Sequence, residues 1–452
     1  MNVNDEFILD IKRLGINGEG IGYYNKLAIF VPNAIPREGH NVKITKLEKK
    51  YAYAESLEIK TKSDSRIEPV CPHFKDCGAC QVMHIDYDKM LEFKRDLLIE
   101  SLTKYTKLNP RSFEIRKTIP SLKQLNYRNR SIQNIRRTKD GLKIFMIKEN
   151  SNNLVPIDKC LVEDNVINNI NNKIISIGNK LNIDTYNQKL KKGALKYVSI
   201  RVNELGDALV TFICHERDNK INKLAEELIN VLNVKGIYLN INNTNKQGEI
   251  FGEELIHLAG EKYIIMTLNN IKYKLYPDTF FQLNTDQARN IFDIVLKNAK
   301  LSKKETVLDA YCGVGAISLY IAKMAKEVIG IEYNKNAIDL AKENALLNKI
   351  NNTEFYQGDS SILLEKMLNE GKKFDVIIVD PPRTGLDDKF INNILKSEAK
   401  KIIYVSCNPQ TLAKNLDKLS VKYNVNSMTP ADMFPYSAHV ETVVSMTRTE
   451  RK

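Results

Sequence analysis

The sequence predicts an α/β protein in three parts: an all-β barrel, a mixed α+β region and a doubly wound, Rossmann-like domain. Short alternating strands fill residues 1–60, a cysteine-rich mixed segment covers residues 61–265, and apolar strands alternate with helical patterns over residues 266–452. A chain of 452 residues is also longer than one compact core normally accommodates. We therefore expect these ranges to be three domains.

The first range has the pattern of a small barrel. Its alternating runs, such as residues 6–11, 27–31 and 41–44, are separated by turn signals such as Gly18-Glu19-Gly20. Strands this short and closely spaced favour a barrel similar to the oligonucleotide-binding fold. Residues 46–53 mix cations with aromatic side chains, which suits a phosphate track with stacking platforms; a solvated strand end is an equally weighted interpretation.

The pattern of helices and strands is less clear in the middle range. It contains an amphipathic helical pattern near residues 89–103, a basic stretch over residues 127–137, and strand patterns at residues 197–202 and 208–214. These mixed patterns predict an α+β region. Part of the segment between Lys89 and Thr118 could also join the last domain, which would shift the boundary between the two.

Composition narrows the class of partner. The chain has 68 Lys and Arg residues and 55 Asp and Glu residues, which gives a formal net charge of +13. This charge favours nucleic acid as the partner; a generally lysine-rich composition is the plainer explanation of the charge. No apolar run follows Met1 and no segment is long enough to span a bilayer, so we expect a cytoplasmic protein without a membrane partner. Seven cysteines in a reducing compartment then favour metal binding or catalysis over disulfides.

The last range has strand patterns at residues 306–308, 328–331, 354–356, 375–379 and 401–405 with helical patterns between them, which indicates a buried parallel sheet. Its first strand ends in the glycine-rich run 309–315, whose glycines permit a tight turn and a close approach to a ligand. Glu332 ends the second strand, where a carboxylate suits ribose hydroxyls. These features fit a dinucleotide and S-adenosylmethionine equally well.

The next two strand ends favour S-adenosylmethionine. Asp359 follows the third strand, where its carboxylate could accept an adenine amino group. The fourth strand ends in Asp380-Pro381-Pro382-Arg383, and the two prolines fix a rigid loop with few free donors. Such a loop can present backbone carbonyls and one carboxylate to a reacting base, whereas hydride-transfer enzymes have no obvious use for it.

A thiol and a carboxylate complete the predicted site. Cys407 follows the strand 401–405, at the edge where open α/β sheets bind ligands, and Glu441 lies at the start of a final strand pattern. One group can attack while the other moves a proton, which suits covalent catalysis. Because the thiolate is the nucleophile, we expect the surroundings of Cys407 to lower its pKa.

These motifs closely resemble those of the RNA 5-methyluridine methyltransferases, which use S-adenosylmethionine: the run 309–315, the loop 380–383, Ser-Cys-Asn-Pro at 406–409 and His-Val-Glu at 439–441. The resemblance covers nearly the whole chain. It implies a class I methyltransferase domain and, for residues 1–60, a TRAM domain, the RNA-binding barrel of the ribosomal RNA branch. Ala316 departs from some members, which carry an asparagine that touches the methionine part. The cofactor contacts that we expect are Gln282, Tyr311, Gly313, Glu332, Asp359 and Asp380.

The resemblance also implies a reaction. Cys407 attacks carbon 6 of uracil, carbon 5 takes the methyl group, Glu441 removes the hydrogen at carbon 5, and Asp380 holds cofactor or base. A TRAM-like domain together with the cysteine set below favours 23S ribosomal RNA. The basic surface and the complete cleft are compatible with a monomer. The alternatives are transfer RNA, a cytosine methyltransferase, and a non-catalytic RNA-binding or assembly factor that retains the fold.

The remaining cysteines form a candidate metal centre. Cys71, Cys77, Cys80 and Cys160 could hold zinc or an iron–sulfur cluster, and the resemblance implies a 4Fe–4S cluster; zinc and free thiols are the alternatives. A target base stacked in folded RNA must also be splayed out before it reaches Cys407. Tyr127, Arg128 and Arg130 are candidates for gripping that strand, with a solvated basic segment as the alternative.

Overall fold

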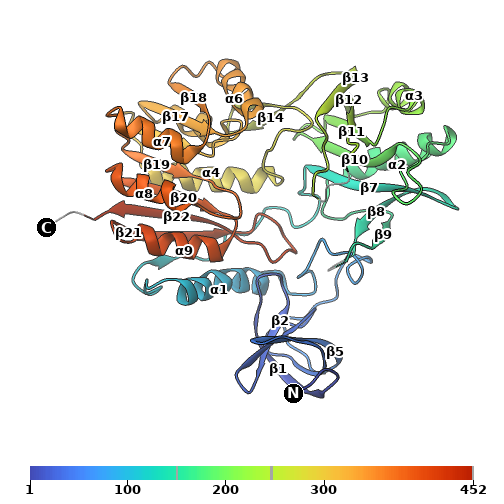
Figure 1. Ribbon diagram of the computed structural model, residues 1–452, viewed down its shortest axis with the longest axis horizontal. Helices are drawn as coiled ribbons and strands as arrows, with labels where there is room; N and C mark the ends of the chain where they lie inside the picture. The colour runs from blue at the N-terminus through green and yellow to red at the C-terminus, as the bar shows by residue number, and fades with distance from the viewer. Residues whose placement is uncertain (149–150, 245–247, 450–452) are drawn as a thin grey trace.

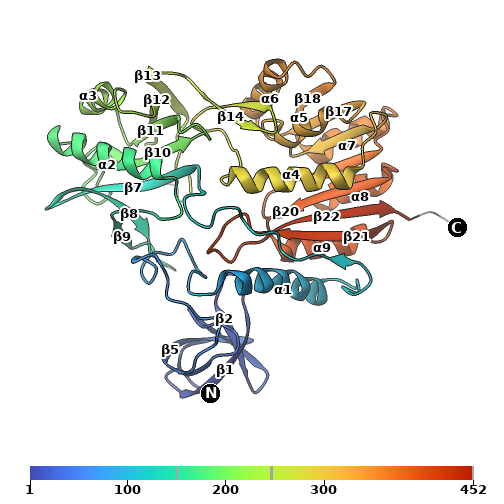
Figure 2. The same cartoon turned by 180° about the vertical axis from the view of Figure 1, so that it is seen from behind.

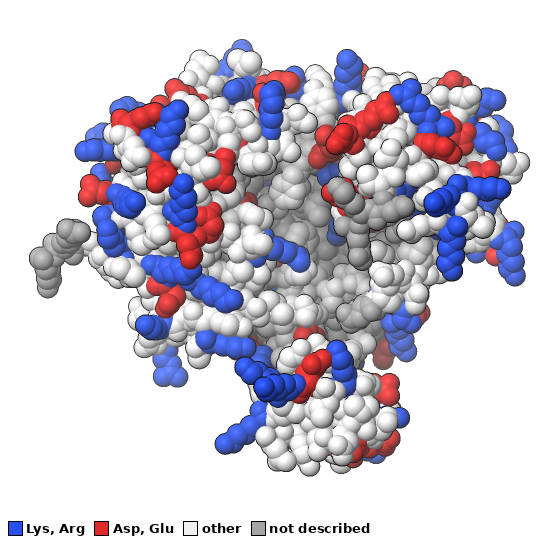
Figure 3. All heavy atoms as spheres, in the orientation of Figure 1, with Lys and Arg blue, Asp and Glu red and all other residues white. Residues whose placement is uncertain are grey.

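The computed structural model describes residues 1–148, 151–244 and 248–449. A barrel, a central domain and a catalytic domain surround a recess on one face of the molecule (Figures 1 and 3). Within the described ranges, no helix combines the length and the apolar character that crossing a membrane would require.

The amino-terminal strands close into a barrel in the order β1-β2-β3-β5-β4, which confirms the predicted all-β domain. Side chains that alternate along the strands fill it, among them Leu9, Ile11 and Ile29. The strands are β1 (Glu6–Leu14), β2 (Gly20–Tyr24), β3 (Leu27–Val31), β4 (Gly39–Leu47) and β5 (Tyr51–Thr61).

The central domain is a mixed sheet in the order β13-β12-β11-β10-β7-β8-β9, covered by two helices that share its apolar core (Figure 2). Strands β10 and β11 are buried along almost their whole length, because helices cover one face and the catalytic domain lies nearby. The elements are β7 (Arg130–Thr138), β8 (Gly141–Ile147), β9 (Leu154–Ile157), α2 (Asn165–Lys180), β10 (Leu195–Val202), β11 (Ala208–Cys214), α3 (Asn219–Leu228), β12 (Val234–Ile241) and β13 (Glu254–Gly260).

The catalytic domain is a doubly wound sheet in the order β18-β17-β16-β19-β20-β22-β21-β6, with an apolar core on each face. The hairpin β14 (Ile264–Leu268) and β15 (Ile271–Leu275) precedes it. One face carries α4 (Thr285–Ala299), α5 (Ala316–Ala322) and α6 (Lys335–Leu347). The other carries α7 (Ser360–Asn369), α8 (Asp388–Lys396) and α9 (Pro409–Leu419). The strands are β16 (Thr306–Ala310), β17 (Glu327–Glu332), β18 (Thr353–Gln357), β19 (Val376–Val379), β20 (Lys401–Ser406), β21 (Tyr423–Ala431) and β22 (Glu441–Arg448).

A segment from before the central domain joins this catalytic sheet. Helix α1 (Tyr87–Tyr105) lies against α9 and buries Leu98 and Leu102 in the core of that face (Figures 1 and 2). Strand β6 (Glu114–Ile115) pairs in parallel with β21 at the sheet edge. By packing, residues 87–119 therefore belong with the catalytic domain, while the boundaries at 60/61 and 265/266 stay predictions.

Candidate active site

The strand registers gather the predicted cofactor residues at one edge of the parallel sheet. Ala310 pairs with Val379 and with Ile331, so the residues that follow these three (Tyr311, Asp380 and Glu332) emerge at neighbouring positions. Parallel strands end at the same edge of a sheet, where ligands of open α/β folds bind. The sequence-based prediction of a shared edge is confirmed for these strands.

The glycine-rich turn is held to the second strand by a carboxylate. Both Tyr311 and Gly313 have a positive φ, of 65° and 55°, so this turn needs backbone conformations that side chains rarely adopt. The Gly313 amide donates to Glu332 Oε2 at 3.2 Å, and the Asn334 amide donates to Oε1 at 2.9 Å. Glu332 is thereby fixed beside the turn.

Acidic side chains surround Tyr311. Burial raises its pKa well above the usual value, and the charges of Asp387, Asp359 and Glu332 raise it further. Asp359 caps α7 through the amides of Ser361 and Ile362, at 2.9 and 3.0 Å. Asp387 caps α8 and accepts the Ser361 hydroxyl at 2.6 Å; the sequence analysis missed it. Its one signal was an aspartate directly before a helical pattern.

Two expected cofactor positions lie further along the chain. Gln282 precedes α4, and its backbone carbonyl accepts from Asn129 Nδ2 at 3.0 Å, so the turn that carries it is anchored to the central domain. Its contact with the cofactor stays a prediction. Ala316 begins α5, and its carbonyl accepts the buried Tyr273 hydroxyl at 2.8 Å.

Cys407 and Glu441, the expected nucleophile and base, follow and begin paired strands. Ser406 of β20 pairs with Thr442 of β22, so the antiparallel register puts Cys407 beside Glu441. The half-buried thiol lies directly before α9, whose N-cap is Asn408. Asn408 Nδ2 donates to the Arg383 carbonyl at 3.1 Å, which ties this loop to the loop after β19.

The electrostatics differ from one expectation. Burial and the charges of Glu441 and Asp380 together raise the pKa of Cys407 to about 11, against the opposing effect of Arg383. The expectation of a lowered pKa is therefore wrong for the protein by itself, because the two carboxylates and partial burial outweigh one guanidinium.

The carboxyl groups are themselves perturbed. Burial raises the pKa of Glu441 well above its usual range, and the charge of Asp380 adds to this. Burial likewise raises the pKa of Asp380 to about 7, with a contribution from the fully buried Asp309. Groups with raised pKa values can hold and release protons near neutral pH, as general acid–base work requires.

Arg383 and His439 are site residues that the sequence analysis left without a role, although both lie inside motifs that it singled out. Arg383 Nη2 lies 3.0 Å from His439 Nε2. Burial, with the charges of Arg383 and Lys94, lowers the pKa of His439 to about 4. The ring is therefore neutral at pH 7, and its Nε2 can accept from the guanidinium.

A cleft of about 730 Å³ opens next to this site, between all three domains (Figure 3). His439 forms part of its wall from the catalytic side, Asn17 from the barrel, and Asn134 and Phe145 from the central sheet. Gln81, next to Cys80, forms another part. The cleft therefore meets the site at His439, the residue whose ring contacts Arg383.

The four candidate metal-binding cysteines converge in one region. Cys71, Cys80 and Cys160 contact the same apolar cluster, and each of the three is half-buried. Burial and the nearby charges of Cys77 and Cys71 together raise the pKa of Cys80 to about 12. Cys80 in turn raises the pKa of Cys160. The thiols therefore lie close enough to repel one another as thiolates, which a bound cation or cluster would relieve.

In the part of the chain that the structure describes, no His, Cys, Asp or Glu side chains form a group of three able to hold a metal ion. Zinc requires sulfur atoms at about 2.3 Å from a single centre, which draws its ligands close together. An iron–sulfur cluster is larger than one ion, so its four thiolate ligands stand further apart. The identity of any group that these cysteines hold stays a prediction.

The structure corrects the expected RNA contacts. Tyr127 is buried against the cysteines, with its hydroxyl donating to the Pro435 carbonyl at 3.2 Å, so it cannot stack on an RNA base. Arg130 is largely buried and donates to the Pro277 carbonyl at 2.8 Å. Arg128 donates to the Arg130 carbonyl at 3.0 Å and lies near the charge of Glu163. Tyr127 and Arg130 therefore bind the central domain to the catalytic domain, whereas the RNA contact of the half-buried Arg128 stays a prediction.

Comparisons with known proteins agree with this site. The family model described as tRNA (Uracil-5-)-methyltransferase matches residues 86–449, and the TRAM domain model matches residues 2–57. Relatives from Enterococcus faecalis and Listeria monocytogenes, both named uncharacterised RNA methyltransferases, are 38% and 39% identical, and each alignment covers 97% of this chain and 97% or 96% of the relative. The crystal structure of Pyrococcus abyssi tRNA (uracil-54, C5)-methyltransferase with S-adenosyl-L-homocysteine is 27% identical, with 98% and 100% coverage and a TM-score of 0.76.

Proposed function

This chain belongs to the tRNA (uracil-5-)-methyltransferase family, and from that membership we propose that it methylates carbon 5 of uridine in 23S ribosomal RNA through a covalent Cys407 adduct. It is an RNA uracil-5-methyltransferase that uses S-adenosylmethionine. The observation that carries the covalent mechanism is the β20–β22 register, which sets the thiol beside a buried carboxyl group at the edge where the cofactor loop ends.

The proposed reaction needs a thiolate and a base at different moments. The Cys407 thiolate attacks carbon 6 of uracil, and the electrons of the carbon 5–carbon 6 double bond move toward the carbon 4 oxygen as an enolate. Carbon 5 then takes the methyl group. Glu441 removes the remaining proton at carbon 5, the double bond re-forms, and the carbon–sulfur bond breaks to release the thiolate.

The surrounding charges support these roles. Arg383 is the cation whose charge lowers the pKa of both Cys407 and Glu441, so it favours the ionised form of each. A base with a raised pKa binds the abstracted proton more strongly once it is deprotonated. Asp380, half-buried between the cofactor edge and Glu441, would hold the base or the cofactor in place.

The chain's own residues fit the methyl donor. When bound, S-adenosylmethionine supplies the methyl group and a positive sulfonium. We propose that Glu332 binds the ribose hydroxyls and that Asp359 accepts from the adenine. The turn at Gly313 would allow close approach, and Tyr311 and Gln282 would form the remaining walls.

The choice of RNA rests on likeness. The TRAM domain and the four cysteines support 23S ribosomal RNA, because both characterise the ribosomal branch that the sequence resembles. Transfer RNA is the second candidate, since the Pyrococcus abyssi enzyme, named for transfer RNA, aligns with 98% of this chain. We further propose that the enzyme acts in the cytoplasm as a monomer, because one chain supplies all the proposed catalytic groups.

We also propose that Cys71, Cys77, Cys80 and Cys160 hold a 4Fe–4S cluster with a structural or RNA-facing role. Anaerobically purified protein should contain iron and absorb visible light. Cys160→Ala should lose both, whereas Cys214→Ala should keep both, because Cys214 is buried in the central sheet and lies outside the apolar cluster that Cys71, Cys80 and Cys160 contact. Colourless wild-type protein with stoichiometric zinc would overturn this assignment.

One experiment tests the function itself. Protein is incubated with methyl-labelled S-adenosylmethionine and unmodified 23S or transfer RNA transcripts, and the label is mapped by nuclease digestion and mass spectrometry. Label at carbon 5 of 23S uridines is expected; label in transfer RNA alone would change the substrate. Cys407→Ala should transfer no methyl group, and Glu441→Gln should accumulate a methylated, denaturation-stable RNA–protein adduct. Undiminished methyl transfer by Cys407→Ala would contradict the covalent mechanism.

A further inference from the structure

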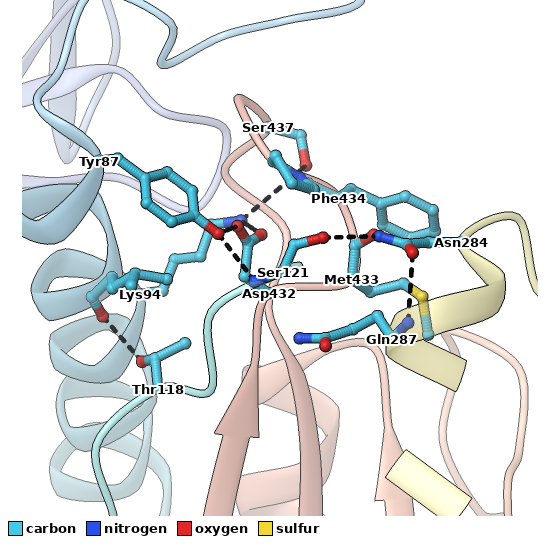
Figure 4. A network of polar contacts seen from close by, with 12 residues as sticks. Tyr87, Lys94, Thr118, Ser121, Asn284, Gln287, Asp432, Met433, Phe434 and Ser437 are labelled. Carbon is cyan, nitrogen blue, oxygen red and sulfur yellow. Dashed lines mark hydrogen bonds and ion pairs between the residues drawn. The ribbon is translucent and has the colours of Figure 1, made fainter. Parts of the chain in front are cut away.

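A fully buried ion pair lies behind the loop that leads to Glu441. Lys94, in the middle of α1, has its Nζ 2.5 Å from Asp432 Oδ1, and the two side chains are 2% and 0% exposed. The Tyr87 hydroxyl donates to the other Asp432 oxygen at 2.9 Å (Figure 4). Burying two charges is costly, and an apolar pair of similar volume is often at least as stable. Stability alone therefore does not explain this pair.

The pair anchors residues 432–440, which connect β21 to β22. Ala431 pairs with Glu441 across the two strands, so Asp432 is the first residue of the loop that returns to the base. The Asp432 amide donates to the Ile119 carbonyl at 2.9 Å. Lys94 also donates to the Phe434 carbonyl at 3.2 Å, so one ammonium group fixes two points of the same loop (Figure 4).

Residues 433–436 of the loop are also fixed by hydrogen bonds, which come from separate parts of the chain. Carbonyls at successive positions each accept a donor from elsewhere: Met433 from Asn284 at 3.1 Å, Phe434 from Lys94 at 3.2 Å, Pro435 from Tyr127 at 3.2 Å, and Tyr436 from the Val82 amide at 3.0 Å. The loop is therefore a junction between α1, the cap of α4 and the cysteine region. Within this junction, the Lys94–Asp432 pair is the contact in which both partners carry charge.

We propose that Lys94 and Asp432 are positioning residues that align Glu441 with carbon 5 of the methylated base. This inference rests on the proposed covalent reaction. Methyl addition needs Cys407 and the cofactor, whereas the release step needs the base at the correct place. A misaligned Glu441 therefore slows removal of the carbon 5 proton and, with it, cleavage of the carbon–sulfur bond. The methylated adduct then accumulates while its formation continues.

The test compares Lys94→Met with the matched control Arg66→Met. Arg66 pairs with the buried Glu38 in the barrel, so its loss also strands a buried carboxylate, but its side chain bonds Glu38 and Asn33 and not residues 432–440. For Lys94→Met we expect a kcat about a hundredfold lower, an apparent KM for RNA that falls with it because the adduct breaks down slowly, and adduct accumulation as in Glu441→Gln. Arg66→Met should lower stability without accumulating adduct.

A double variant separates positioning from folding. Lys94→Met combined with Asp432→Asn removes the stranded charge, so its thermal stability should recover relative to Lys94→Met. Its adduct should still accumulate, because the charged anchor of the loop is absent. Recovery of wild-type kcat in the double variant would overturn the proposal. The proposal would also be overturned if Lys94→Met stays folded and accumulates no adduct while Glu441→Gln does accumulate it. If neither variant accumulates adduct, the result counts against the covalent mechanism instead.

Discussion

The guanidinium of Arg383 lies 3.0 Å from Nε2 of His439, and this contact joins the loop after β19 to the loop before β22. Cys407 and Glu441 lie at the ends of strands next to these loops, and Arg383 favours the ionised form of both. The arrangement gives the proposed nucleophile and the proposed base one shared counter-charge, so changes at Arg383 should affect both.

Replacing Arg383 with methionine should slow the nucleophile. An opposite charge nearby typically shifts a pKa by about 1–3 units, so the thiolate fraction of Cys407 should fall about tenfold or more. Alkylation of Cys407 by iodoacetamide at pH 8, followed by peptide mass spectrometry, measures this directly. Arg111→Met is the matched control, because Arg111 is exposed on the loop before β6. Equal alkylation rates in the two variants would contradict the assigned role.

The pH dependence of Cys407 follows from its raised pKa. With a thiol pKa of about 11, the thiolate is the minor form at neutral pH. Its fraction should rise about tenfold per unit between pH 7 and 9, because only the thiolate is nucleophilic. Cofactor-free protein should therefore show an alkylation rate at this residue that climbs across the whole range. A plateau reached by pH 8 would mean that the pKa lies well below its ordinary value of 9.0, as a lowered thiol pKa would require.

Glu332 should govern cofactor affinity. The Glu332→Gln change keeps the shape but removes the charge that we assign to ribose binding. A hydrogen bond to a charged group contributes about 1.5–3 kcal/mol, so the Kd for S-adenosylhomocysteine should rise roughly 10- to 100-fold. Isothermal titration calorimetry gives both values. The control is Glu354→Gln, at an exposed site on the neighbouring β18, which should leave the Kd unchanged. If the two variants have the same Kd, Glu332 does not bind the cofactor.

Glu38 should make the barrel sensitive to acid. Burial opposes its ionisation, but hydrogen bonds from Arg66 and His40 prevail and lower the pKa to about 2. A lowered folded-state pKa gives stability that is complete above the unfolded value near 4.5 and is lost as the pH falls toward 2. Arg66→Met should cost about 3 kcal/mol at pH 7 and reduce this acid dependence. Urea unfolding at several pH values tests both; parallel curves for the two proteins would contradict it.

The sequence was most informative where local pattern decides position. Apolar runs followed by Tyr311, Glu332 and Asp380 predicted a shared edge, because parallel strands must end together. Tyr127 was misassigned because its neighbours come from residues 71–84 and 434–436, and only the folded chain brings these together. The pKa of Cys407 was misjudged for the same reason: the carboxylates that raise it lie on other strands.

Strand β6 was invisible for a different reason. It has two residues, Glu114 and Ile115, too few for any period to register, and it exists only because the edge of β21 is available to pair with. The amphipathic pattern of the sequence predicted helix α1, but it did not predict that α1 packs against α9.

The position of α1 and β6 has a consequence for how this protein can be synthesised and divided. Both precede the central domain in the chain, yet both complete the catalytic sheet, so the central domain is an insertion within the catalytic one. During translation, β6 and α1 are synthesised before β21 and α9, so they cannot pair and pack until those later elements have been made. A fragment that begins near residue 266 would expose the apolar surface that Leu98 and Leu102 cover, and it would tend to aggregate.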